Sequence, residues 1–515
     1  MDTLPQEVVD QIASGLHRHD LKNILLLTKT FQIAAEKYSD AFKKCKLYPG
    51  DLDKFVTQFR GPRFCWLQEV DFQLQWPEGA PGDSKRDATA RDECLSNQIH
   101  SLFSALKTLE DPEGPQGTVH LKITSPEETS VSDDQPTELL SADWIIRLQR
   151  PEQLPVLRCI GRLRIGYPTV QRWSGPHGKF DLRIFLDLSA KLPNLSNMRA
   201  ELFDEHHCDA EIDRTRIESR ERFSRAEAAP LQMKRAELIF QGERAHHHLD
   251  HSASMPNLIR AGGRDPFSSS LGVVCRHLTQ LQLTAIVDQF FFWPSENGAV
   301  TWPNLESLEV KFHPVTPSGS WYFVGPRGEG RGVQGYSVSG IEYTSENQST
   351  NGGEDEDHSL HIPCQPSLWR VEPNPDTLYP MLLGFAKAAA RMPRLREAMI
   401  WSPIRWSPGN QRSRFGYNSA YSMLNSGKSL GWGIGYNAPG SDEDDDAFEH
   451  EDSDDDDIRI FEWRTARWEP NDEIKAAFHE IGREQYGDEL DDCWDPGANQ
   501  EDLFFEGFCF GAKLS

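Results

Sequence analysis

The sequence has no long apolar run, no closely paired cysteines and no surplus of basic residues. Its longest strongly apolar windows are far shorter than the roughly 20 residues that a membrane helix needs. No charged-then-apolar leader is found at its start. The nine cysteines are scattered without a Cys-x-x-Cys pair, which is typical of reduced intracellular thiols. These absences predict a cytoplasmic or nuclear protein with no membrane partner.

The shortage of basic residues bears on the class of partner. The net charge is −26, and twelve acidic residues lie at 441–457, which leaves −14 for the rest of the chain. Nucleic-acid-binding proteins normally show a basic footprint, so the composition argues against a nucleic-acid partner. The run 441–457 also has too little apolar content to order itself, and we expect it to be disordered.

Motifs for catalysis and metal binding are also missing. The three histidines at 246–248 lack the fixed spacing of a metal site, and residues 206–209 (His-His-Cys-Asp) have no distant paired ligands. His479-Glu480 fails the zinc-protease pattern because position 483 is Arg. No Gly-x-Ser-x-Gly nucleophile motif is present. We therefore expect no catalytic residues, no metal and no cofactor.

What the chain does have is a helical pattern in its first forty residues. Pro5 suits the first turn of a helix, and Gly15 ends it. Apolar residues of this helix recur at spacings of three and four: Val8, Val9, Ile12 and Leu16. Two more short helices are predicted, the second capped by Asp20 and the third ending near Tyr38. Such small helices bury little surface, so they either dock onto a partner or cap the domain that follows.

This stretch resembles an F-box of the fungal kind. The matching residues are Leu4-Pro5-Gln6-Glu7-Val8-Val9, Ile12, Leu16, Asp20-Leu21, Lys29-Thr30-Phe31 and Ile33-Ala34. The family often has Trp where this chain has Phe31, and Ser or Cys where it has Thr28. The resemblance implies docking onto the Skp adaptor of a Skp–cullin–F-box ubiquitin ligase. The implied docking residues, some of which must instead hold the helices together, are Leu4, Pro5, Val8, Ile12, Leu16, Leu21 and Leu25.

The remainder carries a recurring motif, Leu-x-x-apolar-x-apolar. It begins at Leu67, Leu195, Leu278, Leu305 and Leu395. Leu278 and Leu305 are 27 residues apart, within the range of leucine-rich repeats. The motif resembles the strand entry of such repeats, although any half-buried strand after a helix shows the same pattern.

The predicted fold class is α+β or α/β. We expect a three-helix F-box-like unit at 1–43, followed at 44–515 by a degenerate, insertion-rich, leucine-rich-repeat-like α/β solenoid. Disordered inserts are expected near 241–270, 325–362 and 408–457 because these ranges are rich in Gly, Ser or acidic residues. The arrangement resembles fungal F-box proteins with a large C-terminal region of unassigned function.

Aromatic residues near the last repeat-like strand are candidates for binding a target. They are Trp401, Trp406, Tyr417 and Trp432, in a Gly-rich context. Aromatic side chains on loops are common anchors of binding surfaces, but they also pin irregular loops onto a core. The favoured hypothesis is a non-catalytic ligase subunit that recruits an unknown protein substrate. Two alternatives remain: a scaffold whose first helices cap its own core, and an enzyme that uses the aromatic C-terminal region.

Overall fold

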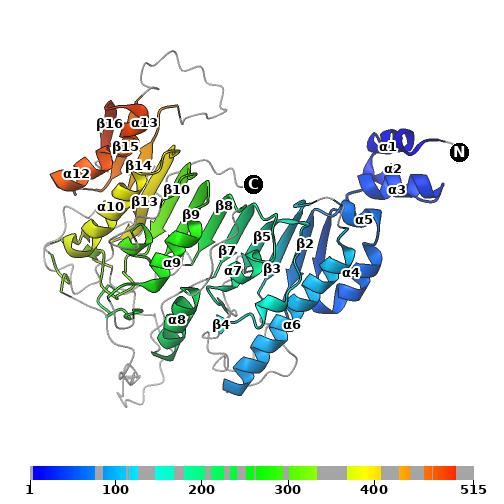
Figure 1. Ribbon diagram of the computed structural model, residues 1–515, viewed down its shortest axis with the longest axis horizontal. Helices are drawn as coiled ribbons and strands as arrows, with labels where there is room; N and C mark the ends of the chain where they lie inside the picture. Colours follow the sequence, from blue (N-terminus) through cyan, green and yellow to red (C-terminus); the bar gives the residue numbers. More distant parts are fainter. Residues whose placement is uncertain are drawn as a thin grey trace, which may run out of the picture. The chain divides into compact units, whose positions relative to one another are not determined.

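The computed structural model describes the greater part of the chain (Figure 1). The described residues are 4–75, 85–111, 114, 116–125, 145–167, 179–202, 204, 210–224, 232–240, 251–259, 263–293, 301–326, 328–332, 368–406, 429–440, 458–466 and 468–494. The chain divides into two compact units. The first comprises Met1–Leu202 and Ala228–Ala236, and the second Phe203–Glu227 and Glu237–Ser515.

The first unit begins with three short helices and continues into a parallel sheet. The helices are α1 (Gln6–Ser14), α2 (Arg18–Ile24) and α3 (Lys29–Tyr38). The strands, in order across the sheet, are β1 (Lys44–Leu47), β2 (Glu69–Gln73), β3 (Val119–Thr124), β5 (Ile160–Gly166) and β7 (Asn197–Glu201). Every neighbouring pair among these strands is parallel.

Helices connect the strands of the first unit. They are η1 (Pro49–Asp51), α4 (Leu52–Gln58), α5 (Pro62–Cys65), α6 (Lys85–Leu109), η2 (Pro151–Gln153) and α7 (Ile184–Ser189). Figure 1 shows α4 and α6 on the same face of the sheet. A small separate pairing joins β4 (Ile145–Ile146) and β6 (Lys179–Phe180). Along β2, β3, β5 and β7 apolar residues alternate with polar ones, and the apolar positions are the buried ones.

The second unit contains a mixed sheet. Its strands, in order, are β9 (Gln280–Ala285), β10 (Ser307–Phe312), β13 (Glu397–Arg405), β14 (Ser429–Asn437), β15 (Arg459–Arg464) and β16 (Leu490–Trp494). The pairs β9–β10, β10–β13 and β15–β16 are parallel, whereas β14 is antiparallel to both neighbours. β11 (Phe323–Val324) pairs with β12 (Glu372–Pro373), and β8 (Arg235–Ile239) contains the division between the units.

The second unit also contains helices, several of which are capped by polar side chains. They are α8 (Ala210–Phe223), α9 (Pro266–Cys275), η4 (Gln289–Phe291), α10 (Pro375–Ala389), α12 (Asp472–His479) and α13 (Arg483–Tyr486). Asn471 caps α12, because its side chain accepts a hydrogen bond from the backbone N–H of Ile474. Asn374 caps α10. Asp20, expected to cap the second helix, instead lies in the first turn of α2, whose N-cap is His17. None of the described helices combines the length and the apolar composition that a membrane crossing requires.

The recurring leucine motif does form neighbouring parallel strands. Leu281 on β9 is paired with Leu308 on β10, and Leu308 with Ala398 on β13. In the first unit Met198, from the motif that begins at Leu195, is paired with Leu163 on β5, which lacks the motif. All five paired side chains are at most 3% exposed. The prediction of a mixed α/β fold with mainly parallel pairing is therefore confirmed.

Two ranges expected to be inserts contain regular structure. β14 lies within 408–457, and its glycines resemble a loop in the sequence. Gly433 is required there because a Cβ at this position would lie 2.5 Å from the Cβ of Trp401. α9 begins inside 241–270, where the Asp265 side chain accepts hydrogen bonds from the backbone N–H groups of Phe267 and Ser268. The acidic run 441–457 and most of 325–362 lie outside the described residues.

The second unit buries a cluster of five charged side chains. Arg216 contacts Asp204 at 2.7 Å and Asp213 at 3.1 Å. Arg220 contacts Asp204 at 2.8 Å and Asp265 at 2.6 Å. Each of these side chains is at most 3% exposed. A buried charge is tolerated only when it is paired and hydrogen-bonded, and both guanidinium groups are held in this way.

Candidate functional site

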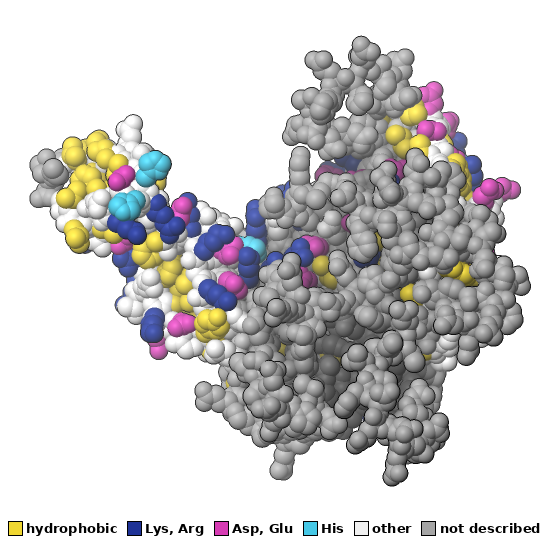
Figure 2. All heavy atoms as spheres, turned by 180° about the vertical axis from the view of Figure 1, so that it is seen from behind, with side chains coloured by type: hydrophobic (Ala, Val, Ile, Leu, Met, Phe, Trp, Pro, Cys, Tyr) yellow, Lys and Arg dark blue, Asp and Glu magenta, His cyan; other side chains and the backbone are white. Residues whose placement is uncertain are grey.

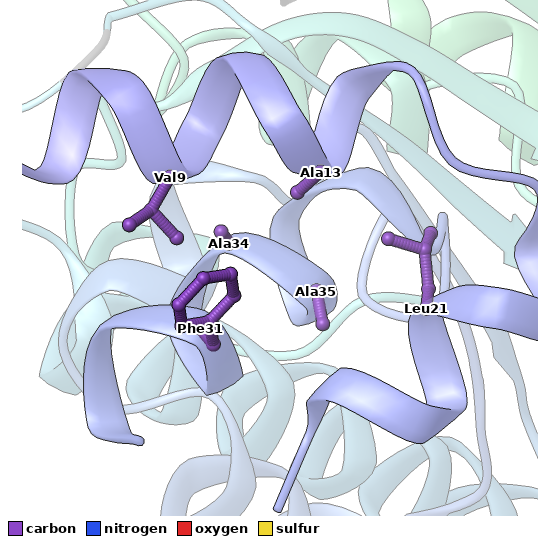
Figure 3. Packing of buried hydrophobic residues seen from close by; sticks show 6 residues of the cluster. All are labelled: Val9, Ala13, Leu21, Phe31, Ala34 and Ala35. Atoms are coloured by element: carbon purple, nitrogen blue, oxygen red, sulfur yellow. The ribbon is translucent and has the colours of Figure 1, made fainter. Parts of the chain in front are cut away.

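The three N-terminal helices bury a core of their own (Figure 3). Its fully buried members are Val9, Ala13, Leu21, Phe31, Ala34 and Ala35. Four partly buried residues pack around them: Leu16, Ile24, Leu25 and Tyr38. Because Ala34 and Ala35 are small, the surface of α3 can receive the inner side of α1 closely. We call residues 4–38 the helical module.

Polar contacts fix α1 against α3 inside this module. The Lys37 ammonium lies 2.6 Å from the Asp10 carboxylate, and the Gln6 amide donates to the same carboxylate at 2.8 Å. Partial burial works to raise the pKa of Asp10, but the hydrogen bonds from Lys37 and Gln6 prevail and lower it. Asp10 is therefore a carboxylate at neutral pH. The pair is partly solvated, so its contribution to stability is small, about 0 to 1 kcal/mol.

A second apolar stripe runs along the outside of α1. Leu4, Val8 and Ile12 are 39%, 40% and 45% exposed. Val8 and Ile12 are four residues apart, which places them on one side of α1, and Leu4 lies just before the helix begins. Val9 and Ala13 point into the core instead (Figure 3). The module therefore keeps one apolar stripe for itself and presents another to solvent, and Figure 2 shows hydrophobic side chains at this surface.

Two further exposed apolar residues follow α2. Leu26 is 95% exposed and Leu27 is 51% exposed. They were not among the residues predicted to dock a partner. The run Ile24-Leu25-Leu26-Leu27 contained the signal, because four consecutive apolar residues cannot all face one core. In the structure Ile24 and Leu25 pack inward, and Leu26 and Leu27 are left at the surface.

The structure sorts the seven residues predicted to dock a partner. Exposed residues are Leu4, Pro5, Val8 and Ile12. Leu21 is only 2% exposed and belongs to the core, so it has no free surface for docking. Leu16 and Leu25 pack against that core and are only partly accessible. Leu16, Leu21 and Leu25 therefore hold the helices together, and Leu4, Pro5, Val8 and Ile12 are the predicted docking residues that the structure leaves exposed.

A bidentate ion pair joins the module to α5 of the first unit. Arg63 on α5 donates to both carboxylate oxygens of Glu36, at 2.8 and 2.6 Å. The hydrogen bond from Arg63 lowers the pKa of Glu36. The same guanidinium lies 4.6 Å from the ring centre of Phe42, in a cation–π contact. Glu36 is thus fully ionised at neutral pH, and the end of α3 is tied to α5.

The aromatic residues predicted to bind a target lie mostly inside the second unit. Trp432 is fully buried, with its ring centre 5.4 Å from that of Phe323, and Trp406 is 4% exposed. Both side chains are buried and are not surface anchors; Trp432 lies on β14, and Trp406 directly follows β13. Trp401 is half-buried and donates its indole N–H to Glu309 at 2.9 Å. Tyr417 lies outside the described residues.

Comparison with known proteins adds no identity. No protein-family model and no curated protein matches this chain. Within the described ranges no group of His, Cys, Asp and Glu is arranged to hold a metal ion. The histidine clusters at 206–209 and 246–248 lie outside those ranges. The outer stripe of α1, with Leu26 and Leu27, is therefore the candidate site, and its side chains are apolar and exposed.

Proposed function

We propose that the helical module is an F-box that docks onto the Skp adaptor of a cullin ubiquitin ligase. The remainder of the chain then recruits a protein target to the ligase. We interpret the parallel strands with their recurring leucine motif as a degenerate, leucine-rich-repeat-like solenoid. Under this interpretation the chain is a recognition subunit and performs no catalytic step.

The observation that carries the proposal is the exposed apolar stripe of Leu4, Val8 and Ile12. The module does not use this stripe for its own core, to which α1 contributes Val9 and Ala13, about 100° around the helix from Val8 and Ile12. Fully burying a Val, Leu or Ile side chain contributes about 1.5 to 3 kcal/mol, so leaving several exposed is costly unless a partner covers them. A helix that only capped its own domain would instead have turned this stripe inward.

The test is binding of purified Skp adaptor to the full chain, measured by calorimetry. Val8→Glu/Ile12→Glu places two charges on the outer stripe without touching the core. We expect affinity to fall by a factor corresponding to about 2 kcal/mol or more, as for the central residues of an interface. Thermal melting of the variant should match that of the unmodified protein.

A matched control introduces the same charges away from the stripe. Ser14→Glu/Asn23→Glu changes two exposed positions of α1 and α2, and Ser14 lies about 200° around the helix from Ile12. The control should retain adaptor binding. Leu16→Asp would not test the outer stripe. Leu16 packs against the module core, and its loss would unfold the helices.

Two results would sink the proposal. One is absence of adaptor binding by the unmodified chain at micromolar concentrations. The other is equal loss of binding in the stripe variant and the control, since that would point to charge and not to apolar contact. Deletion of residues 1–40 distinguishes the adaptor proposal from the scaffold alternative. If the core of the body needs these helices, the shortened chain should lose its cooperative melt.

A further inference from the structure

The open face of the sheet in the first unit carries two rows of polar side chains. They alternate along each strand with the buried apolar residues. The first row, in register across the strands, is Lys44, Glu69, His120, Arg162 and Asn197. The second row is Lys46, Asp71, Lys122, Arg164 and Arg199. Figure 2 views the first unit from the side opposite α4 and α6, and Lys and Arg side chains are visible there.

The charge of this face is opposite to that of the chain. The two rows hold six Lys or Arg residues and only two carboxylates, and Glu201 at the end of β7 adds a third carboxylate. The chain as a whole has a net charge of −26. A cationic sheet face within an acidic protein is therefore a local feature, and the overall composition conceals it. We call these two rows the cationic face.

Three cations of the second row stand on adjacent strands. Lys122 is paired with Arg164, and Arg164 with Arg199. Neighbouring strands are about 4.8 Å apart, and like charges directly opposite one another destabilise a sheet. Glu69 contacts Lys122 at 2.9 Å, and Glu201 contacts Arg164 at 3.1 Å and Arg199 at 2.8 Å. These carboxylates orient the cations, but they are too few to neutralise the row.

The pKa of His120 responds to the charges on this face. Burial is the main reason that its pKa falls to about 4, and the nearby Lys122, Arg162 and Arg164 lower it further, against the opposing effect of Glu69. The imidazole is therefore neutral at physiological pH. An anion placed among these cations would reverse part of their effect and raise the pKa of His120.

We propose that the cationic face binds an acidic, Asp- and Glu-rich protein segment. The segment would lie across the strands, where successive side chains meet Arg162, Lys122, Arg164 and Arg199. These four side chains remain partly or largely accessible. The inference goes beyond the adaptor docking proposed above, since it concerns another surface and a partner of different chemistry.

A protein segment fits this face better than a nucleic acid does. Proteins that bind single strands add aromatic platforms for base stacking to their basic groove. Among the ten positions of the two rows, His120 is the only residue with an aromatic ring. The interspersed carboxylates Glu69 and Asp71 would also repel a continuous phosphate backbone. An acidic peptide can instead place its uncharged residues opposite these two carboxylates.

The experiment measures binding of a fluorescent Asp/Glu-rich peptide to the full chain by anisotropy, over a range of salt concentrations. Arg162→Glu/Arg164→Glu reverses two charges of the cationic face. We expect peptide affinity to fall by about tenfold or more, and the affinity of the unmodified protein to fall with salt. Lys54→Glu/Arg60→Glu, on and just after α4, makes the same change in net charge at exposed positions elsewhere and should leave affinity within about twofold.

Nuclear magnetic resonance of His120 supplies a second readout. Its pKa should rise above about 4 in Arg162→Glu/Arg164→Glu, and should also rise when the peptide binds the unmodified protein. A purely structural role of the cations predicts no response to peptide. Adaptor binding should be unchanged in this variant, so failure here and failure of the adaptor proposal are distinguishable.

Three outcomes would overturn the inference. They are absence of peptide binding at low salt, equal loss of binding in both double variants, and tighter binding of a charge-matched oligothymidylate that the same cations support. The last result would reassign the face to a nucleic-acid partner.

Discussion

The two units place their charged residues in opposite ways. The first unit carries Lys122, Arg162 and Arg164 on the open face of its sheet. In the second unit, the cluster around Arg216 and Arg220 is buried. At the matching sheet positions of the second unit, β9 presents uncharged Gln280, Gln282 and Thr284.

The same alternation of inward apolar and outward polar residues along a strand therefore serves two purposes. In both units the inward positions are apolar and buried, and they specify the parallel pairing. The outward positions are free to vary, so one unit can keep a surface that attracts anions. Charges inside the second unit cannot meet a ligand and contribute only to folding. Five substitutions, grouped in four predictions, break or sharpen this contrast.

Arg220→Met should have the largest effect. It removes the cation between Asp204 and Asp265 and leaves their charge underpaired in a buried site. Breaking a buried pair in this way typically costs about 3 to 5 kcal/mol. Urea unfolding followed by tryptophan fluorescence measures the loss. Arg214→Met changes an exposed residue of the same helix and should cost little, so similar losses in the two variants would refute the assigned role.

Leu163→Ala and Leu308→Ala should have comparable effects in the two units. Both side chains are at most 2% exposed and occupy corresponding inward positions of parallel strands. Leu-to-Ala changes in cores cost about 2 to 5 kcal/mol, because apolar contact is lost and a cavity remains. Denaturant unfolding tests both. A loss confined to one unit's variant would contradict the equivalence of the inward positions.

Asp288→Asn should change the pH dependence of stability. Burial raises the pKa of Asp288 to about 8, and the neighbouring Asp265 carboxylate adds to the rise. The folded protein thus keeps a proton that the unfolded chain loses above about pH 4. Asp288 therefore makes stability fall as pH rises from about 4 to about 8. The variant should flatten this decline and exceed the unmodified protein in stability above pH 8.

Urea titrations at a series of pH values check this expectation. Asp472→Asn, at an exposed position of α12, should leave the decline in place. An unchanged slope in Asp288→Asn would show that Asp288 ionises normally in the folded protein.

Arg162→Gln should have the smallest effect on stability. The side chain is exposed, and surface substitutions of this kind usually stay within about 0.5 kcal/mol. Thermal melting measures the change. A loss comparable to that of Arg220→Met would mean that the cationic face holds the sheet together, and the contrast between the units would disappear.

The sequence was sufficient to predict several of the parallel strands, because β2, β7, β9, β10 and β13 each have a leucine three residues before two alternating apolar positions. It was not sufficient for β14, where Gly431, Gly433 and Gly435 resemble a loop. Gly433 is explained only by the position of Trp401 on the neighbouring strand, which leaves no room for a side chain there. The need for this glycine arises from a contact between distant parts of the chain, which local pattern does not contain.

The candidate site was predicted in part. Adjacent Val8 and Val9 showed that α1 has two apolar sides, but spacing alone cannot decide which side faces the core. Ala34 and Ala35 on α3 decide it, because their small side chains accept Val9. The cationic face was missed for a different reason. Its residues are scattered from Lys44 to Arg199, and only strand register brings them together.

The exposed leucines of the helical module have a practical consequence for handling the protein. Leu26, at 95% exposed, and its neighbour Leu27 lie on a small module that also exposes Ile12. Exposed apolar patches favour contact between copies as concentration rises. Preparations of the chain alone should therefore self-associate at the concentrations used for crystallisation. Leu26→Lys offers a route to a well-behaved sample, since that side chain makes no contribution to the module core.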